Sequence, residues 1–202
     1  MSSAPAGRLR HVDDVRALAF VGLLALTGAY TSVLWRVTDV VGGSAEFVAV
    51  VVAALALAGL VGRYVGVRVA LGVTSGLLAL GLAAYLLALP QSQVALLTPL
   101  RVVNDTVALL TGLSILRLVG AGVWAVAVVP GPVFLSWYLA VRRRYVSAAV
   151  AGSLALALVV LTGDADAVTT VVGVLGATTT VAASTFERHG SGLAQADVLT
   201  AL

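Results

Sequence analysis

Few residues of this 202-residue chain have side chains that could carry out catalysis or bind a metal. Cysteine is absent, which excludes disulfides, thiolate metal sites and a cysteine nucleophile. The two histidines, His11 and His189, lie near opposite ends of the chain with no ligand motif around them. No phosphate-binding loop, dinucleotide fingerprint or metalloprotease helix is present. The sequence therefore predicts no catalytic residue, no cofactor and no metal.

Two carboxylates lie close together in the segment Thr162-Gly-Asp-Ala-Asp166. Asp164 and Asp166 offer hard oxygen ligands of the kind that Ca²⁺ prefers, but a full calcium site needs six to eight oxygens. This short loop cannot supply that number by itself. We expect an exposed turn, with calcium binding as the alternative.

Arg117 is the basic residue set most closely among apolar neighbours, between Leu116 and Leu118. One interpretation is a contact to an anion or a lipid headgroup. The other is an arginine at a helix end whose long side chain reaches back to the membrane surface. We favour the second interpretation.

Pro130-Gly131-Pro132 interrupts a long apolar run. Proline has no backbone donor, so it kinks a helix and leaves carbonyl groups without partners, and transporters use such breaks to build ion sites. Ordinary membrane helices also contain proline kinks whose backbone groups are satisfied by neighbours. No acidic side chain lies within the predicted spans to complete a cation site, which favours a structural kink.

The elements that must position these residues are set by composition. The chain is 60% hydrophobic and only 10% charged, with a mean hydropathy of +1.09. A soluble domain carries about 25% charged residues, so this chain cannot cover a water-facing surface. The net charge of +3 comes from arginines that punctuate apolar runs, which indicates a lipid bilayer rather than nucleic acid as the partner.

A membrane-crossing helix needs about 20 predominantly apolar residues. The intervals between charged residues, with the third helix ending near Leu89 before Pro90, predict six such helices. Their expected ranges are 17–36, 46–63, 67–89, 123–142, 145–163 and 167–186. The fold class is therefore an all-α membrane helix bundle over 17–186, with a polar N-terminus at 1–16 and a tail at 187–202.

The distribution of arginine predicts the orientation. With the N-terminus in the cytoplasm, nine arginines fall inside and three outside, which fits the excess of basic residues in cytoplasmic loops. We therefore expect a multi-pass cell-membrane protein with both termini inside. The main topology anchors are Arg63, Arg68, Arg142, Arg143 and Arg144.

The segment 104–120 is the exception to this count. Asn104-Asp105-Thr106 resembles a helix N-cap, and an apolar helix would then run toward Arg117. As a seventh span it would put Arg142–Arg144 outside, against the charge bias, so we prefer a short helix on the outer face. The seven-span arrangement is the alternative.

Two further patterns concern packing. Gly72-Val-Thr-Ser-Gly76 matches GxxxG and is expected to admit a neighbouring helix of the same chain, with homodimerisation as the alternative. Aromatic residues fall near the predicted helix ends, as in a belt at the headgroup level. These residues are Trp35, Phe47, Tyr64, Tyr85, Trp124, Tyr138, Tyr145 and Phe186.

Four stretches together resemble a known family: Val107–Leu118, Val133–Tyr145, Leu161–Asp166 and Phe186–Gly190. They are similar to the N-terminal membrane region of TgpA-type transglutaminase-like proteins of halophilic archaea. The resemblance covers roughly the whole chain and implies a membrane domain that precedes an extracytoplasmic catalytic domain with a Cys-His-Asp triad. No triad residue can be carried over, because this chain has no cysteine.

Three functions follow as hypotheses. The first is a non-catalytic membrane anchor whose missing C-terminal domain is its partner. It is supported by Gly190-Ser-Gly192, an expected flexible break, and by an apolar pattern after it that stops abruptly, as in a fragment of a longer protein. The second is a small transporter or channel subunit with a proline-broken fourth span. The third is a membrane enzyme that acts on lipid at Arg117 and Asp105.

Overall fold

The computed structural model describes the backbone of residues 6–41, 43–95, 99–118 and 120–200. Within these ranges all regular structure is helical and no strand occurs, which confirms the predicted fold class. The helices are α1 (Ala6–Val41), α2 (Ser44–Val61), α3 (Val67–Ala88), α4 (Gln91–Val94), α5 (Pro99–Leu110), the 3₁₀ helix η1 (Ile115–Arg117), α6 (Ala121–Val128), α7 (Pro130–Val141), α8 (Tyr145–Leu161) and α9 (Ala167–Thr200).

Five stretches of the described chain are helical, long and apolar enough to cross a membrane. They are Val15–Val40, Ser44–Val61, Val67–Ala88, Ala121–Val141 and Ala167–Phe186. The fourth of them comprises α6 and α7. Helix α8 is also apolar but shorter, at 17 residues.

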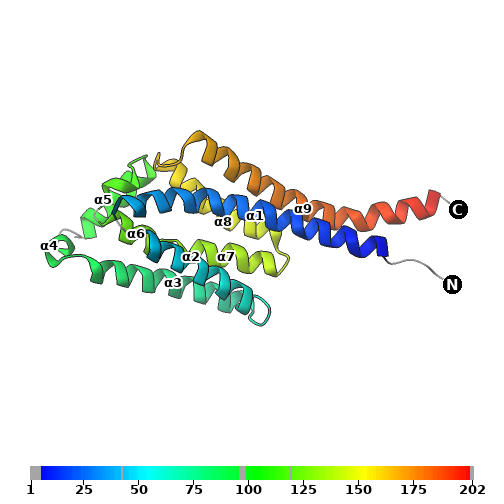
Figure 1. Ribbon diagram of the computed structural model, residues 1–202, viewed down its shortest axis with the longest axis horizontal. Helices are drawn as coiled ribbons and strands as arrows, with labels where there is room; N and C mark the ends of the chain where they lie inside the picture. The colour runs from blue at the N-terminus through cyan, green and yellow to red at the C-terminus, as the bar shows by residue number, and fades with distance from the viewer. Residues whose placement is uncertain (1–5, 42, 96–98, 119, 201–202) are drawn as a thin grey trace.

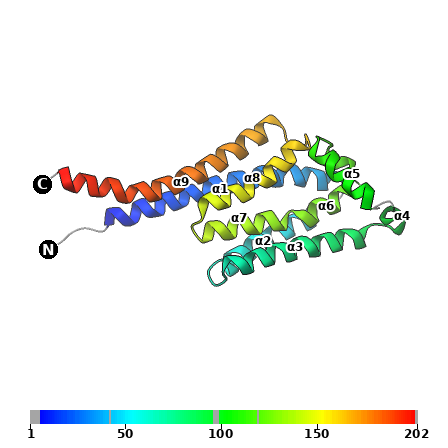
Figure 2. The same ribbon diagram turned by 180° about the vertical axis from the view of Figure 1, so that it is seen from behind.

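The helices form an elongated bundle, and the two chain ends leave it at the same side (Figures 1 and 2). Helices α1 and α9 lie side by side and extend beyond the bundle there. The turns at 62–66 and 142–144 face the same way, and we call this side the terminal end. Helices α4 and α5 and the α8–α9 turn lie at the opposite side, the distal end.

The centre of the bundle is built on α7, which packs against α1, α2, α3 and α8. In the most apolar 18 residues of Ala121–Val141, 61% of the residues are buried, whereas the corresponding share is 17% in α2 and in α3. The broken helix is therefore the most enclosed of these elements. The side chains of Tyr30, Phe134 and Tyr138 are fully buried there. The outer faces of α2 and α3 are apolar and exposed, as expected for helices that contact lipid.

Glycine allows a very close helix contact at the crossing of α1 and α9. A Cβ atom on Gly176 would lie 2.5 Å from the backbone nitrogen of Leu26, and one on Gly22 would lie 2.7 Å from the carbonyl oxygen of Gly176. The two backbones therefore touch. The GxxxG pattern of Gly72 and Gly76 does not do this, since nothing lies within 4 Å of a Cβ at either position. The expectation of packing within the chain is wrong for this pair.

The first and last helices are longer than the expected spans. α1 begins at Ala6 rather than at residue 17, and α9 continues to Thr200 through Gly190-Ser-Gly192, where a break was expected. The segment 1–16 is therefore helical from residue 6, and 187–200 continues a helix. These extensions run beside each other from the terminal end (Figure 1).

The segment 104–120 forms two short elements at the distal end. α5 starts at Pro99, so Asn104-Asp105-Thr106 lies inside a helix and the expected N-cap is wrong. Proline suits a first helical turn because its missing donor has no role there. The helix ends at Leu110, before Gly112 with φ +103°, and its 12 residues rise about 18 Å, too short to cross a 30 Å hydrocarbon core.

The aromatic residues divide into two groups. Tyr64 and Trp35 are exposed near helix ends, and Phe186 is exposed where the apolar part of α9 ends, which fits the expected belt. Four others are buried within the bundle: Phe47, Tyr85, Tyr138 and Tyr145. For these four the belt interpretation is wrong, because they pack against neighbouring helices instead of reaching the surface.

Candidate functional site

The break in the fourth apolar run lies between α6 and α7. Val129 keeps a right-handed helical conformation, and Pro130 and Pro132 occupy the first turn of α7. The backbone N–H of Val129 donates to the carbonyl of Ala125 at 3.1 Å, and that of Val133 donates to the carbonyl of Val129 at 3.3 Å. The helical path therefore continues through the break, while each proline removes one donor from it.

Helix α3 closes the bundle over this break. A Cβ atom on Gly81 would lie 2.1 Å from the carbonyl oxygen of Ala127, so only a glycine fits at that position. A Cβ on Gly131 would lie 2.7 Å from a methyl group of Leu78. Helix α3 therefore covers Ala127, which lies between Val126 and Val128, the residues whose carbonyls lose their donors to the prolines. The covering of those two carbonyls themselves stays a prediction. No sequence pattern indicates the role of Gly81, because that role depends on a residue 46 positions away.

A cavity of about 380 Å³ lies beside the break, among α2, α3 and α6. Pro130 lines it together with Val50, Leu57, Leu77 and Val126. Its wall holds no carboxylate, histidine or basic side chain. This wall offers a cation no charged ligand, and Tyr85 is its one residue with a polar side chain.

The hydroxyl groups of Ser136 and Thr111 would be the polar partners of the break if it formed an ion site. Ser136 is fully buried and donates to the carbonyl of Val133 at 3.2 Å, within its own helix. Thr111 lies beyond α5 and donates to the carbonyl of Val107 at 3.0 Å. Neither lines the cavity. Both hydroxyls therefore serve their own backbone.

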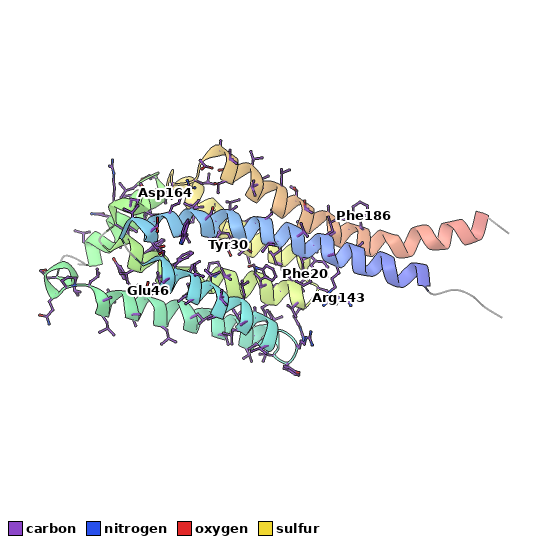
Figure 3. The ribbon with its side chains drawn as sticks, viewed as in Figure 1. Phe20, Tyr30, Glu46, Arg143, Asp164 and Phe186 are labelled. Atoms are coloured by element: carbon purple, nitrogen blue, oxygen red, sulfur yellow. The ribbon has the colours of Figure 1, made fainter. Side chains whose placement is uncertain are left out.

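A small neutral polar cluster lies deeper in the core, between α1 and α7. The indole Nε1 of Trp137 donates to Thr27 Oγ1 at 3.0 Å. The hydroxyl of Tyr30, in the middle of the bundle in Figure 3, is fully buried beside Thr27 and Ser136. These groups link two central helices. Among the described side chains no charged group belongs to the cluster, so it cannot relay a proton between an acid and a base.

Asp164 fastens the α8–α9 turn to η1 at the distal end (Figure 3). Its carboxylate accepts hydrogen bonds from the hydroxyl of Ser114 at 2.5 Å and from the backbone N–H of Ile115 at 2.7 Å. Ser114 is also the N-cap of η1 and accepts from the backbone N–H of Leu116. The expected exposed turn is therefore half-buried at Asp164, which joins segments 50 residues apart.

Asp166 has a different role, as the cap of α9. Its Oδ1 accepts from the backbone N–H of Thr169 at 2.7 Å, and its Oδ2 pairs with Arg36 at 3.2 Å. The bond from Thr169 is the main cause that lowers the pKa of Asp166, and Arg36 adds to it. The position of an aspartate directly before an apolar run is a cap signal that the sequence does contain. The two carboxylates do not converge on one point, and no group that could hold a metal occurs among the described residues.

Arg117 is the last residue of η1 and is exposed at the distal end. This position fits the interpretation of an arginine at a helix end. The side chains of Asp105, His11 and His189 lie outside the part of the chain whose side chains the structure describes. The hypothesis of a lipid-modifying cleft between Arg117 and Asp105 therefore stays a prediction.

The terminal end carries the predicted topology anchors. Arg63 and Arg68 flank the α2–α3 turn, and Arg142–Arg144 form the α7–α8 turn; all are exposed. The hydroxyl of Tyr138 donates to the carbonyl of Val65 at 2.6 Å and so fastens the α2–α3 turn to α7, close to the second turn. The structure thus gathers arginines that are far apart in the sequence onto one surface.

The chain matches no family model, and no curated protein or solved structure shows significant similarity to it. The class that the fold itself defines is an all-helical protein with helices long and apolar enough to span a membrane. The resemblance to the membrane region of transglutaminase-like proteins stays a prediction.

Proposed function

We propose that this chain is a non-catalytic membrane-anchoring domain. The observation that carries this proposal is the apolar closure of the helix break at Pro130. That break is the place where a transporter of this sequence would need exposed backbone carbonyls and polar partners. Instead α3 packs on Ala127 through Gly81, and the adjacent cavity has an apolar wall.

The anchor crosses the membrane six times. Helix α8 is the sixth span: its 17 residues rise about 26 Å, which crosses a 30 Å core with slight local thinning. An even number of passes agrees with the two chain ends at the same side of the bundle (Figure 2). It also keeps Arg142–Arg144 on the side of the N-terminus.

The cell membrane is the proposed location, with the terminal end in the cytoplasm. Five exposed arginines lie in or beside the turns of that end: Arg63, Arg68, Arg142, Arg143 and Arg144. The carboxylates whose side chains the structure describes lie at or near the distal end: Asp39, Glu46, Asp164 and Asp166. Basic residues are retained on the cytoplasmic side during insertion, so this separation supports the orientation.

The protein that this domain anchors is proposed from the resemblance alone. A transglutaminase-like catalytic domain outside the membrane would be the partner, and it would supply the Cys-His-Asp triad. The coding sequence after the Leu202 codon tests this link. Continuation into a domain with that triad is expected, and a stop codon directly after Leu202 would overturn the link while leaving the membrane anchor in place.

The anchor itself is tested by ion flux in liposomes that contain the purified protein. We expect cation leakage no faster than in protein-free liposomes, because the cavity beside Pro130 has a mainly apolar wall without charged side chains. A matched variant with Pro130→Ala and Pro132→Ala should behave identically. Flux well above the protein-free rate that is abolished by the double substitution would overturn the anchor and establish a channel or transporter.

A further inference from the structure

A second groove, of about 660 Å³, runs along the outside of the bundle between α3 and α8, with α7 as its floor. Its wall is mainly aliphatic: Leu71 and Leu78 come from α3, Pro132 and Leu135 from α7, and Val150 and Leu154 from α8. Several of these side chains are exposed, so the groove opens toward the surroundings of the bundle.

The length of the groove corresponds to one leaflet of a bilayer. On α3 it extends from Val67, the first residue of the helix, to Leu78, which is the first half of this 22-residue helix. Eleven residues of helix rise about 17 Å, and half of a 30 Å hydrocarbon core is about 15 Å. The groove therefore starts at the terminal end and reaches about the middle of the membrane.

The mouth of the groove is positively charged. Arg144 belongs to its wall and is exposed at the terminal end. Arg144 is the N-cap residue of α8, and its guanidinium group, which only donates hydrogen bonds, cannot cap the free N–H groups of that helix end. The start of α8 adds the partial positive charge of a helix N-terminus. No carboxylate lies at this end among the side chains that the structure describes.

We propose that this groove binds one anionic phospholipid of the leaflet at the terminal end, with an acyl chain along α3, α7 and α8 and the phosphate at Arg144. Charge complementarity at the mouth and an aliphatic wall of one leaflet's length select this occupant. The proposal rests on the placement in the membrane given above. It assigns Pro132 a place in the floor of the groove, so that one break shapes a cavity on one side of α7 and a lipid groove on the other.

The test measures lipid that stays bound when the full chain is extracted into detergent from vesicles of equal parts phosphatidylglycerol and phosphatidylcholine. Native mass spectrometry counts the bound lipids. We expect one phosphatidylglycerol per chain, retained in preference to phosphatidylcholine. Arg144→Gln should lower this retention about fivefold, the effect of one basic side chain near an anionic headgroup. The matched control Arg142→Gln, an exposed arginine outside the groove wall, should leave it unchanged.

A second pair of variants tests the apolar part. Ala155→Leu places extra volume in the groove wall and should reduce retention, whereas Ala157→Leu, on an exposed part of α8 outside the wall, should not. Equal losses in Arg144→Gln and Arg142→Gln, equal retention of both lipids, or no retained lipid would each overturn the proposal. Carbonate extraction of the same membranes keeps the outcomes distinct, because a chain released by carbonate would overturn the membrane placement itself.

Discussion

The two ends of the bundle use charge in opposite ways. At the distal end, Asp164 and Asp166 are engaged by hydrogen bonds from neighbouring segments, and Asp166 also pairs with Arg36. At the terminal end, exposed arginines lie together without a described carboxylate near them (Figure 3 shows Arg143 and Asp164 on opposite sides).

This difference separates two tasks of charged residues. Asp164 and Asp166 determine the local structure of turns, because each accepts a hydrogen bond from a backbone N–H that would otherwise lack a partner. At the terminal end the Tyr138 hydroxyl on the Val65 carbonyl holds local structure, and the arginines are exposed at the surface. We therefore expect distal substitutions to change stability and terminal substitutions to change orientation and lipid contact.

The largest expected effect is reversal of charge in the α7–α8 turn. Replacement of Arg142, Arg143 and Arg144 by glutamate should produce comparable fractions of both membrane orientations, because these residues supply a third of the predicted cytoplasmic arginines. A cysteine at exposed Tyr64, the sole cysteine of such a variant, should then react with an impermeant maleimide in intact cells. The same cysteine with the native arginines should stay unlabelled.

Replacement of the three arginines by lysine is the matched control and should keep Tyr64→Cys protected. A cysteine at Val40, near the distal end of α1, should be labelled in intact cells when the arginines are native. Unchanged labelling after the reversal to glutamate would contradict the assignment of the topology to this turn.

Asp164→Ala should give the largest loss of stability among the distal variants. It leaves the N–H of Ile115 and the hydroxyl of Ser114 without their acceptor in a half-buried site, at a cost of about 2 kcal/mol. The free energy of unfolding in a mixed-micelle SDS titration measures this loss. Asp39→Ala, an exposed carboxylate, serves as control and should change little. If Asp164→Ala and Asp39→Ala lowered the free energy of unfolding equally, the hydrogen bonds of Asp164 would not explain its effect on stability.

Asp166→Ala should have a smaller effect that depends on pH. The folded pKa of Asp166 is lowered, so the charged form stabilises the fold above the unfolded pKa of about 3.9, and this contribution is lost as pH falls through the folded pKa. The difference in thermal midpoint between the native protein and the variant should be clear at pH 7 and shrink on acidification. A difference that grows toward low pH would contradict the assigned bond from Thr169.

The smallest effect is expected for Arg36→Gln. The partners of this ion pair expose 50% and 53% of their side chains, and such pairs contribute little because water screens them. The unfolding free energy should stay within the error of the titration. A loss as large as that of Asp164→Ala would show that the distal end depends on ion pairing rather than on backbone hydrogen bonds.

Much of the architecture could be predicted from the sequence because it depends on local properties. Apolar runs of about 20 residues bounded by arginine or proline predict helices, and the observed α2, α3, α8 and the α6–α7 pair lie close to the expected ranges. The break at Pro130 was predicted for the same reason, since proline acts on its own helix. Errors arose in two other ways: Pro99, a local signal for a helix start, was passed over, and the glycine signal for a break at Gly190 was overridden, since α9 continues through it.

The sequence by itself determined the class of element, the approximate bounds of the apolar helices and the separation of charge, because each follows from residues near one another in the chain. Only the tertiary structure decided which side of each helix is enclosed. Gly81 touches α6 while Gly76 on the same helix touches nothing, and Tyr138 is buried while Tyr64 is exposed. Packing between helices decides these outcomes. In a membrane helix the side that faces lipid and the side that faces protein are both apolar, so the residue types alone hardly distinguish them.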